Sequence, residues 1–338
     1  IQANHVVHNF GDLVVERLAD MGEGEIVREE LLGELRNYYS DFIEYATNDT
    51  DMTKHVVEAR LRLAEVHIKT NRWAEAAANL NAAMESIAKQ ATQSLPPTVA
   101  DALLSQSLAK LAVVQATDES LGPWQVSMRR AIELGLNGSP SAKSTFVIAG
   151  LYAQEGELWL MKDQSREAVA ALHMASACLD DAREQDEGLL DAPEMLKLDL
   201  IVHNNLASLA QHDDPQKSAA WLRRAIEAGE KLVSAFPGSP RHRAQLAQLL
   251  ANQGELAHER KSSSLAEHSL QSSARVWEGL SQQFTSNERY RLELATVQNR
   301  LGQFYLQHGR LPLAKSAFLD AAQELASVDL SHHEPATI

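Results

Sequence analysis

Small side chains recur along this chain at intervals of 44 to 51 residues, and each one starts the same local pattern. The small residue is followed by a short polar turn and then by a second segment rich in alanine and leucine. The six small residues are Ala64, Ala112, Gly156, Ala207, Gly254 and Gly302. Recurrence at a fixed period is typical of stacked repeats, in which each unit buries its apolar face against its neighbours. The chain is therefore expected to be an array of repeats.

The segments between the turns favour helix, because they are rich in Ala, Leu, Glu, Gln and Arg. The prolines fall in short polar stretches or where a helix would have to turn back, positions that suit a residue without an N–H. The one Asn-Gly pair, Asn137-Gly138, joins two helical segments rather than two alternating apolar runs. An all-α chain of helix hairpins is predicted.

The last hairpin shows the pattern most clearly, with small residues where the helices approach and large ones beside them. Its pattern residues are Leu301, Gly302, Tyr305, Ala314, Phe318 and Ala321. This order resembles the tetratricopeptide (TPR) motif. The resemblance implies a right-handed superhelix, or solenoid, of about six TPR-like hairpins with long repeats. Because the period exceeds the usual 34 residues of that motif, a HEAT-like repeat of about 40–47 residues stays open as an alternative.

Residues 1–54 are expected to form N-terminal capping helices, since two amphipathic stretches, residues 5–18 and 26–47, precede the first repeat. The repeat array is expected over residues 55–328, followed by a flexible tail at 329–338. The six repeats are placed near residues 55–90, 99–136, 143–182, 196–236, 241–284 and 289–328.

A more specific likeness covers residues 24–87. There the run Arg28-Glu-Glu-Leu-Leu-Gly-Glu-Leu-Arg-Asn-Tyr-Tyr-Ser-Asp-Phe-Ile-Glu-Tyr precedes Ala59-Arg-Leu-Arg-Leu-Ala-Glu-Val-His. This segment is similar to the helical C-terminal region of certain bacterial serine/threonine protein kinases. No glycine-rich phosphate loop, His-Arg-Asp or Asp-Phe-Gly motif of a kinase catalytic lobe occurs in the sequence. The resemblance implies the non-catalytic, partner-binding or regulatory part of such a kinase.

The excess of acidic over basic residues limits the kinds of partner that this chain can bind. With 46 acidic and 31 basic residues the formal charge is −15, which argues against wide contact with nucleic acid or an anionic membrane surface. No apolar run approaches the roughly 18 residues that a membrane span needs. We expect a protein or peptide ligand, no nucleic acid and no direct membrane insertion. Localisation, oligomeric state and the presence of an upstream kinase domain or membrane span stay open.

Residue types that can act in catalysis or bind metals are present, but none of them forms a complete catalytic or metal-binding motif. The segment 138–144 lacks the glycines and the preceding strand of a phosphate loop. Ser-x-x-Lys occurs at residues 86–89 and 107–110 without companion motifs, and the single cysteine, Cys178, has no visible paired base. The His5/His8 pair and the 332–334 His-His-Glu run offer too few ligands for a structural metal. We therefore expect no catalytic residues, no metal, no cofactor and no enzyme.

In TPR proteins the first helix of each hairpin lines a concave groove, so the resemblance implies ligand-facing positions beside each small residue. Amides there can both donate to and accept from a peptide backbone. The candidate groove residues are Asn204, Asn205, Asn252, Asn299, Arg300, Gln303, Arg62 and Lys110. The sequence predicts a protein–protein interaction scaffold that binds a peptide or partner helix, with a small-molecule-sensing helical-repeat regulatory domain as the alternative.

Overall fold

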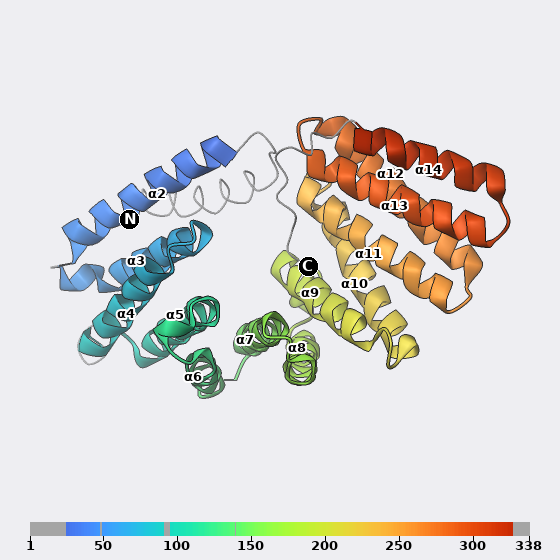
Figure 1. Ribbon diagram of the computed structural model, residues 1–338. Coiled ribbons are helices and arrows are strands. Elements are labelled where there is room, and N and C mark those ends of the chain that lie inside the picture. Colours follow the sequence, from blue (N-terminus) through green and yellow to red (C-terminus); the bar gives the residue numbers. More distant parts are fainter. Residues whose placement is uncertain (1–24, 48, 91–94, 139, 327–338) are drawn as a thin grey trace. The chain divides into compact units, whose positions relative to one another are not determined.

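The computed structural model describes residues 25–47, 49–90, 95–138 and 140–326, coloured along the chain in Figure 1. These residues form thirteen α-helices, three short 3-10 helices and no strand, so the predicted all-α fold is confirmed. The α-helices are α2 (Glu25–Ala46), α3 (Thr53–Lys69), α4 (Trp73–Gln90), α5 (Pro97–Thr117), α6 (Trp124–Leu136), α7 (Ala142–Met161), α8 (Ser165–Gln185), α9 (Pro193–Ala210), α10 (Pro215–Ala235), α11 (Pro240–Glu259), α12 (Ser263–Gln283), α13 (Glu288–Gln307) and α14 (Leu311–Ala326).

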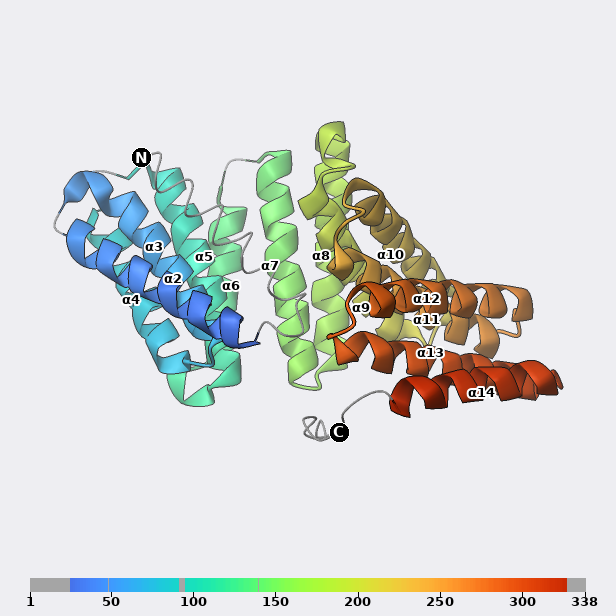
Figure 2. The same cartoon turned by 90° about the horizontal axis from the view of Figure 1, so that it is seen from above.

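After α2, the described helices pair into six hairpins, each with a first and a second helix: α3/α4, α5/α6, α7/α8, α9/α10, α11/α12 and α13/α14. The chain divides into two compact units, an N-terminal unit of residues 26–195 and a C-terminal unit of residues 196–338 to which residues 1–25 also belong; of this second unit the structure describes Glu25 and residues 196–326. Within each unit a second helix packs on the first helix of the next hairpin, as α4 does on α5 and α12 on α13. Figure 2 shows the last hairpin, with α13 and α14 side by side.

Three glycines explain how closely the paired helices approach. A Cβ added to Gly156 would lie 2.7 Å from the Leu172 side chain, and one added to Gly254 would lie 2.6 Å from Leu270. In the last hairpin a Cβ on Gly302 would lie 2.6 Å from the ring of Phe318. Real Cβ atoms do not approach other atoms so closely, so only glycine fits at these crossings. The recurring small residue is therefore a packing requirement of the hairpin.

The turn between first and second helix also repeats. Seven positions after the small residue, the chain adopts a left-handed conformation in four hairpins. The residues and their φ angles are Asn71 (56°), Asp163 (56°), Lys261 (58°) and Gly309 (69°). In each case the next backbone N–H donates back to the carbonyl five residues earlier, as from Arg310 to Tyr305 at 2.9 Å. This hydrogen bond closes the first helix in the manner of a Schellman motif.

Lys261 is the least suited of these residues to its backbone conformation, because a side chain at positive φ is strained. We expect Lys261→Gly to raise the free energy of unfolding by about 0.5–1 kcal/mol, the relief being partly offset by the extra freedom of glycine in the unfolded chain. The reverse change in the equivalent turn, Gly309→Lys, should lower it by about 1 kcal/mol. Urea unfolding of both variants checks the pair, and a loss of stability in Lys261→Gly would contradict this account.

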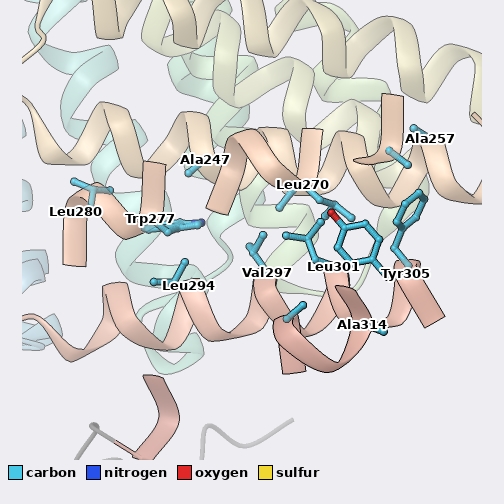
Figure 3. Close-up of a cluster of buried hydrophobic side chains, with 14 of the residues drawn as sticks. Ala247, Ala257, Leu270, Trp277, Leu280, Leu294, Val297, Leu301, Tyr305 and Ala314 are labelled. Carbon is cyan, nitrogen blue, oxygen red and sulfur yellow. The ribbon is translucent and has the colours of Figure 1, made fainter. Parts of the chain in front are cut away.

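The core is continuous from one hairpin to the next within a unit. In the C-terminal unit, Trp277 and Leu280 of α12 lie over Leu294 of α13, and Leu270 lies beside Leu301 and Tyr305 (Figure 3). All six side chains are at least nine-tenths buried. Their burial between successive hairpins shows that a hairpin here is completed by its neighbour, as expected of a repeat protein.

Candidate functional site

The candidate groove residues fall on first helices in both units. In the C-terminal unit Asn204 and Asn205 lie on α9, Asn252 on α11, and three more on α13: Asn299, Arg300 and Gln303. In the N-terminal unit Arg62 lies on α3 and Lys110 on α5. None is buried, and Asn299 and Gln303 are exposed. We refer to these six residues of the C-terminal unit together as the amide face.

Two of the predicted groove residues take part in the same inter-repeat ion pair. Lys110 on α5 pairs with Glu65 on α3, and Arg300 on α13 pairs with Glu255 on α11 at 2.9 Å. In both pairs the base lies two positions before its small residue, and the acid lies one position after the small residue of the preceding hairpin. First helices of successive hairpins are thus tied together at equivalent points in each unit. These cations have a structural partner in addition to any role toward a ligand.

The carboxylate of Glu65 is held by two cations, since Arg62 also donates to it at 3.1 Å. Burial by itself would raise the pKa of this carboxyl, but the charges and hydrogen bonds of Lys110 and Arg62 outweigh burial, and the pKa lies below its ordinary value. At neutral pH the site is therefore a stable pairing of one carboxylate with two cations.

A depressed pKa in the folded chain makes stability depend on pH. The unfolded carboxyl binds protons at higher pH than the folded one, so the stabilisation is complete above the unfolded pKa of about 4.3 and is lost as pH falls through the lower folded pKa. We expect Glu65→Gln to cost about 1 kcal/mol at pH 7, and the difference from the native chain to shrink progressively as the pH is lowered through the depressed folded pKa of Glu65. Urea unfolding across this range measures it.

The matched control is Glu133→Gln, which removes an exposed pair with Arg130 on the same helix. This change should cost less than about 0.5 kcal/mol at pH 7. If Glu65→Gln and Glu133→Gln behave alike, the inter-repeat pair contributes no more than an ordinary surface pair.

The carboxamides of the amide face differ in whether they are already engaged. Asn252 accepts a hydrogen bond from Gln248 at 3.1 Å on the same helix. Asn204, Asn205, Asn299 and Gln303 have no hydrogen-bond partner within the described chain. Asn299 and Gln303 lie four residues apart on α13, which places both amides on one side of that helix. The free donors and acceptors of these four residues suit a peptide backbone.

Three surface hollows can be described, and none of them is lined by a residue of the amide face. One, of about 590 Å³, lies between α2 and α4 over α3. A second, of about 520 Å³, is lined from α10, α11 and α12. The third, of about 390 Å³, is an apolar hollow on the last hairpin, lined by residues such as Leu311 and Leu319.

The residues considered for catalysis have local structural roles. Ser86 and Ser107 donate to helix carbonyls at 2.8 Å, and Ser141 in the segment 138–144 forms a capping box with Ser144 at the start of α7. Cys178 is half-buried, and burial, with Asp181, raises the pKa of its thiol, which lowers its reactivity. Within the described residues no three His, Cys, Asp or Glu side chains group to hold a metal. His5, His8 and residues 332–334 lie outside the described residues.

A buried polar cluster between α9 and α10 was not predicted from the sequence. The Asp199 carboxylate accepts from Nε and Nη2 of Arg224, both at 3.2 Å, and lies 3.0 Å from Nδ1 of His203. Asp199 and His203 are almost fully buried, and the Trp221 ring lies 5.2 Å from the His203 ring. In the sequence, Asp199, His203 and Arg224 stand as isolated polar residues in two amphipathic helical segments. Their positions along the chain do not show that the three side chains meet. The cluster joins the two helices of the fourth hairpin.

Comparison with known proteins shows the fold. No family model and no curated protein matches the sequence. Among solved structures, BtubC (BKLC) from P. vanneervenii is 16% identical with a TM-score of 0.53, covering 78% of this chain and 94% of its own. The S. pombe nuclear import adaptor Nro1, a hypoxic regulator of sterol synthesis, is 12% identical with a TM-score of 0.58, covering 91% of this chain and 97% of its own. The chain thus has a helical-repeat fold built of TPR-like hairpins.

One further finding concerns membranes: within the described residues no helix is both long enough and apolar enough to span a bilayer.

Proposed function

We propose that this chain is a non-catalytic interaction scaffold whose amide face binds an extended peptide or a partner helix. The observation that carries the proposal is the set of four unpartnered carboxamides, Asn204, Asn205, Asn299 and Gln303. Each offers both a donor and an acceptor, so together they can hold a backbone with little regard for its side chains. The Arg300–Glu255 pair supports the same proposal because it fixes α13 against α11 before a ligand arrives.

The role described for a structurally similar protein agrees with this proposal. Nro1, a protein of the same fold, is described as a nuclear import adaptor. The likeness of residues 24–87 to the C-terminal region of bacterial serine/threonine kinases gives the proposal its context: the chain serves as the partner-binding module of a signalling kinase. Sequencing the gene upstream of Ile1 tests this context directly, and a complete gene without a kinase domain would refute it.

The binding test starts by screening a displayed library of random dodecamer peptides for binding to the whole chain. The affinity of the enriched peptides is then measured by fluorescence polarisation for the native chain and for Asn299→Ala combined with Gln303→Ala. Loss of the two amides should weaken binding about tenfold, since each removes a hydrogen bond from the ligand. Gln282→Ala on α12, an exposed amide away from the amide face, is the matched control and should change affinity less than about twofold. Equal loss in both variants, or no enriched peptide, would refute the proposal.

A further inference from the structure

A hollow of the C-terminal unit lies on the side of α11 that faces away from Asn252 of the amide face. It forms where α11 packs on both α10 and α12, and its volume is about 520 Å³. Arg243, Leu246 and Leu250 line it from α11, and their spacing of three and four residues puts them on one side of that helix. Asn252 follows Arg243 by nine residues, or two and a half turns, so it lies on the opposite side. We call this hollow the α11 hollow.

The lining of the α11 hollow is mostly apolar and accessible from outside. Besides Leu246 and Leu250, it includes Val233 from α10 and Val276 from α12. These four side chains are only partly buried, so each presents part of its apolar surface to the hollow. Covering such a surface with apolar groups of a ligand is favourable, because the apolar area is removed from water.

Two arginines that line the hollow have only neutral hydrogen-bond partners. Arg243 donates to the side-chain oxygen of Gln283 at 2.7 Å. Arg275 donates to the backbone carbonyl of Gln271 at 3.4 Å and to the hydroxyl of Ser272 at 2.9 Å. A guanidinium has five N–H donors, so most donors of both arginines have no acceptor within the described residues. Each arginine can therefore bind a carboxylate without breaking an ion pair.

The two guanidinium groups lie on either side of Val276 along α12. The guanidinium of Arg275 lies beside residues 271–272, before Val276. The guanidinium of Arg243 lies beyond Val276, with Nη2 at 3.2 Å from the position that a Cβ on Gly279 would take. An apolar group seated in the hollow therefore has a cation on each side of it along α12.

The segments that form the hollow are basic, although the chain as a whole is acidic. No Asp or Glu occurs in residues 231–254 or 268–277, whereas 46 of the 338 residues of the chain are acidic. The basic residues of these two segments are Lys231, Arg241, Arg243 and Arg275. The acidic residues next to them, Glu230 and Glu278, are exposed, and in the described structure neither forms an ion pair with Arg243 or Arg275. The local charge therefore favours an acidic partner.

We propose that the α11 hollow docks an acidic segment of a partner protein. The segment places an apolar side chain against Val233, Leu246 and Val276, and it places a carboxylate on each of Arg243 and Arg275. Charge complementarity selects this partner, because a neutral or basic segment of the same shape brings no acceptor of matching charge to the two guanidinium groups. The proposal goes beyond the amide face, since it concerns the opposite side of α11 and a different chemistry of recognition.

The probe is the peptide acetyl-Glu-Glu-Leu-Leu-Glu-Glu-amide, titrated into the whole chain by isothermal calorimetry. We expect saturable one-to-one binding that weakens about tenfold between about 50 mM and about 300 mM salt, because exposed charges are screened. Arg243→Met and Arg275→Met should each weaken binding about fivefold or more, since a charge-assisted pairing is lost. A peptide with Gln in place of each Glu, and one with Ser in place of each Leu, should each bind about tenfold more weakly.

Two control variants separate this site from net charge and from the amide face. Arg260→Met removes an exposed arginine at the other end of α11, so it changes the net charge by the same amount as Arg275→Met. The second control, Asn299→Ala combined with Gln303→Ala, alters the amide face alone. Both controls should leave the affinity for the probe within about twofold of the native chain.

Three outcomes would overturn the proposal. They are the absence of saturable binding, an equal loss in Arg260→Met and Arg275→Met, and a loss of binding in the amide-face variant. Because Arg275 is exposed, Arg275→Met decides the case even if Arg243→Met does not fold. Val233→Glu adds an independent check: it places a carboxylate in the hollow at a partly exposed position, and it should abolish binding while circular dichroism shows a folded chain.

Discussion

Replacing Gly254 with leucine should lower the free energy of unfolding of the C-terminal unit by about 3 kcal/mol or more. A Cβ at this position would lie 2.6 Å from Cγ of Leu270 and 3.3 Å from the carbonyl oxygen of Ala266. The leucine side chain could in principle rotate, but the carbonyl belongs to the backbone of α12 and cannot swing aside. The hairpin α11/α12 must therefore open. Urea unfolding measures the loss, and hydrogen exchange should place it in α11 and α12.

The decisive control compares alanine at two helical glycines. A Cβ on Gly33, in the interior of α2, meets nothing within 4 Å, so Gly33→Ala should stabilise the chain by about 0.5–1 kcal/mol through helix propensity. Gly254→Ala gains the same propensity but meets Leu270, so it should be destabilising on balance. If both alanine variants stabilise the chain, close packing is not why position 254 is glycine.

The hairpin architecture could be predicted because each repeat needs a small residue where its two helices cross. That requirement is local and steric, so it appears in the sequence as a period, most visibly at Gly156, Gly254 and Gly302. The left-handed turn seven positions later was less visible. Asn71 and Gly309 suit positive φ, but Asp163 and Lys261 adopt it because the flanking helices and their hydrogen bonds impose it. The division into two units was not predicted, since the interval that spans residue 195, 51 residues from Gly156 to Ala207, is only slightly longer than the other intervals.

The candidate site was predicted less completely than the fold. Repeat position identified which residues lie beside the small ones, but it could not show which of them already have partners. Lys110 and Arg300 bind carboxylates of the preceding hairpin, some 45 residues away in sequence, and such pairings depend on how hairpins stack. Sequence period therefore locates positions, and only the packing assigns their partners.

The second large effect is expected at Asp199. Its carboxylate joins Arg224 and His203, and removal of one member of a buried polar cluster leaves the others desolvated without compensation. We expect Asp199→Ala to cost about 3 kcal/mol, toward the lower end of the range for buried pairs because Arg224 keeps some contact with solvent. Urea unfolding gives the size, and faster hydrogen exchange should be confined to α9, α10 and the helices packed on them.

Two variants separate the loss of charge from the loss of shape. Asp199→Asn keeps an acceptor of the same size, so it should cost less than alanine, about 1–2 kcal/mol. Arg224→Met together with Asp199→Leu replaces the cation and the anion by apolar groups, and should recover part of the loss, because no unpaired charge is left. Were the double variant as unstable as the two single losses added together, the residues would not act as a cluster. The fourth hairpin would then be held by its apolar contacts, such as Leu200 with Leu222, and the cluster would serve some purpose other than stability.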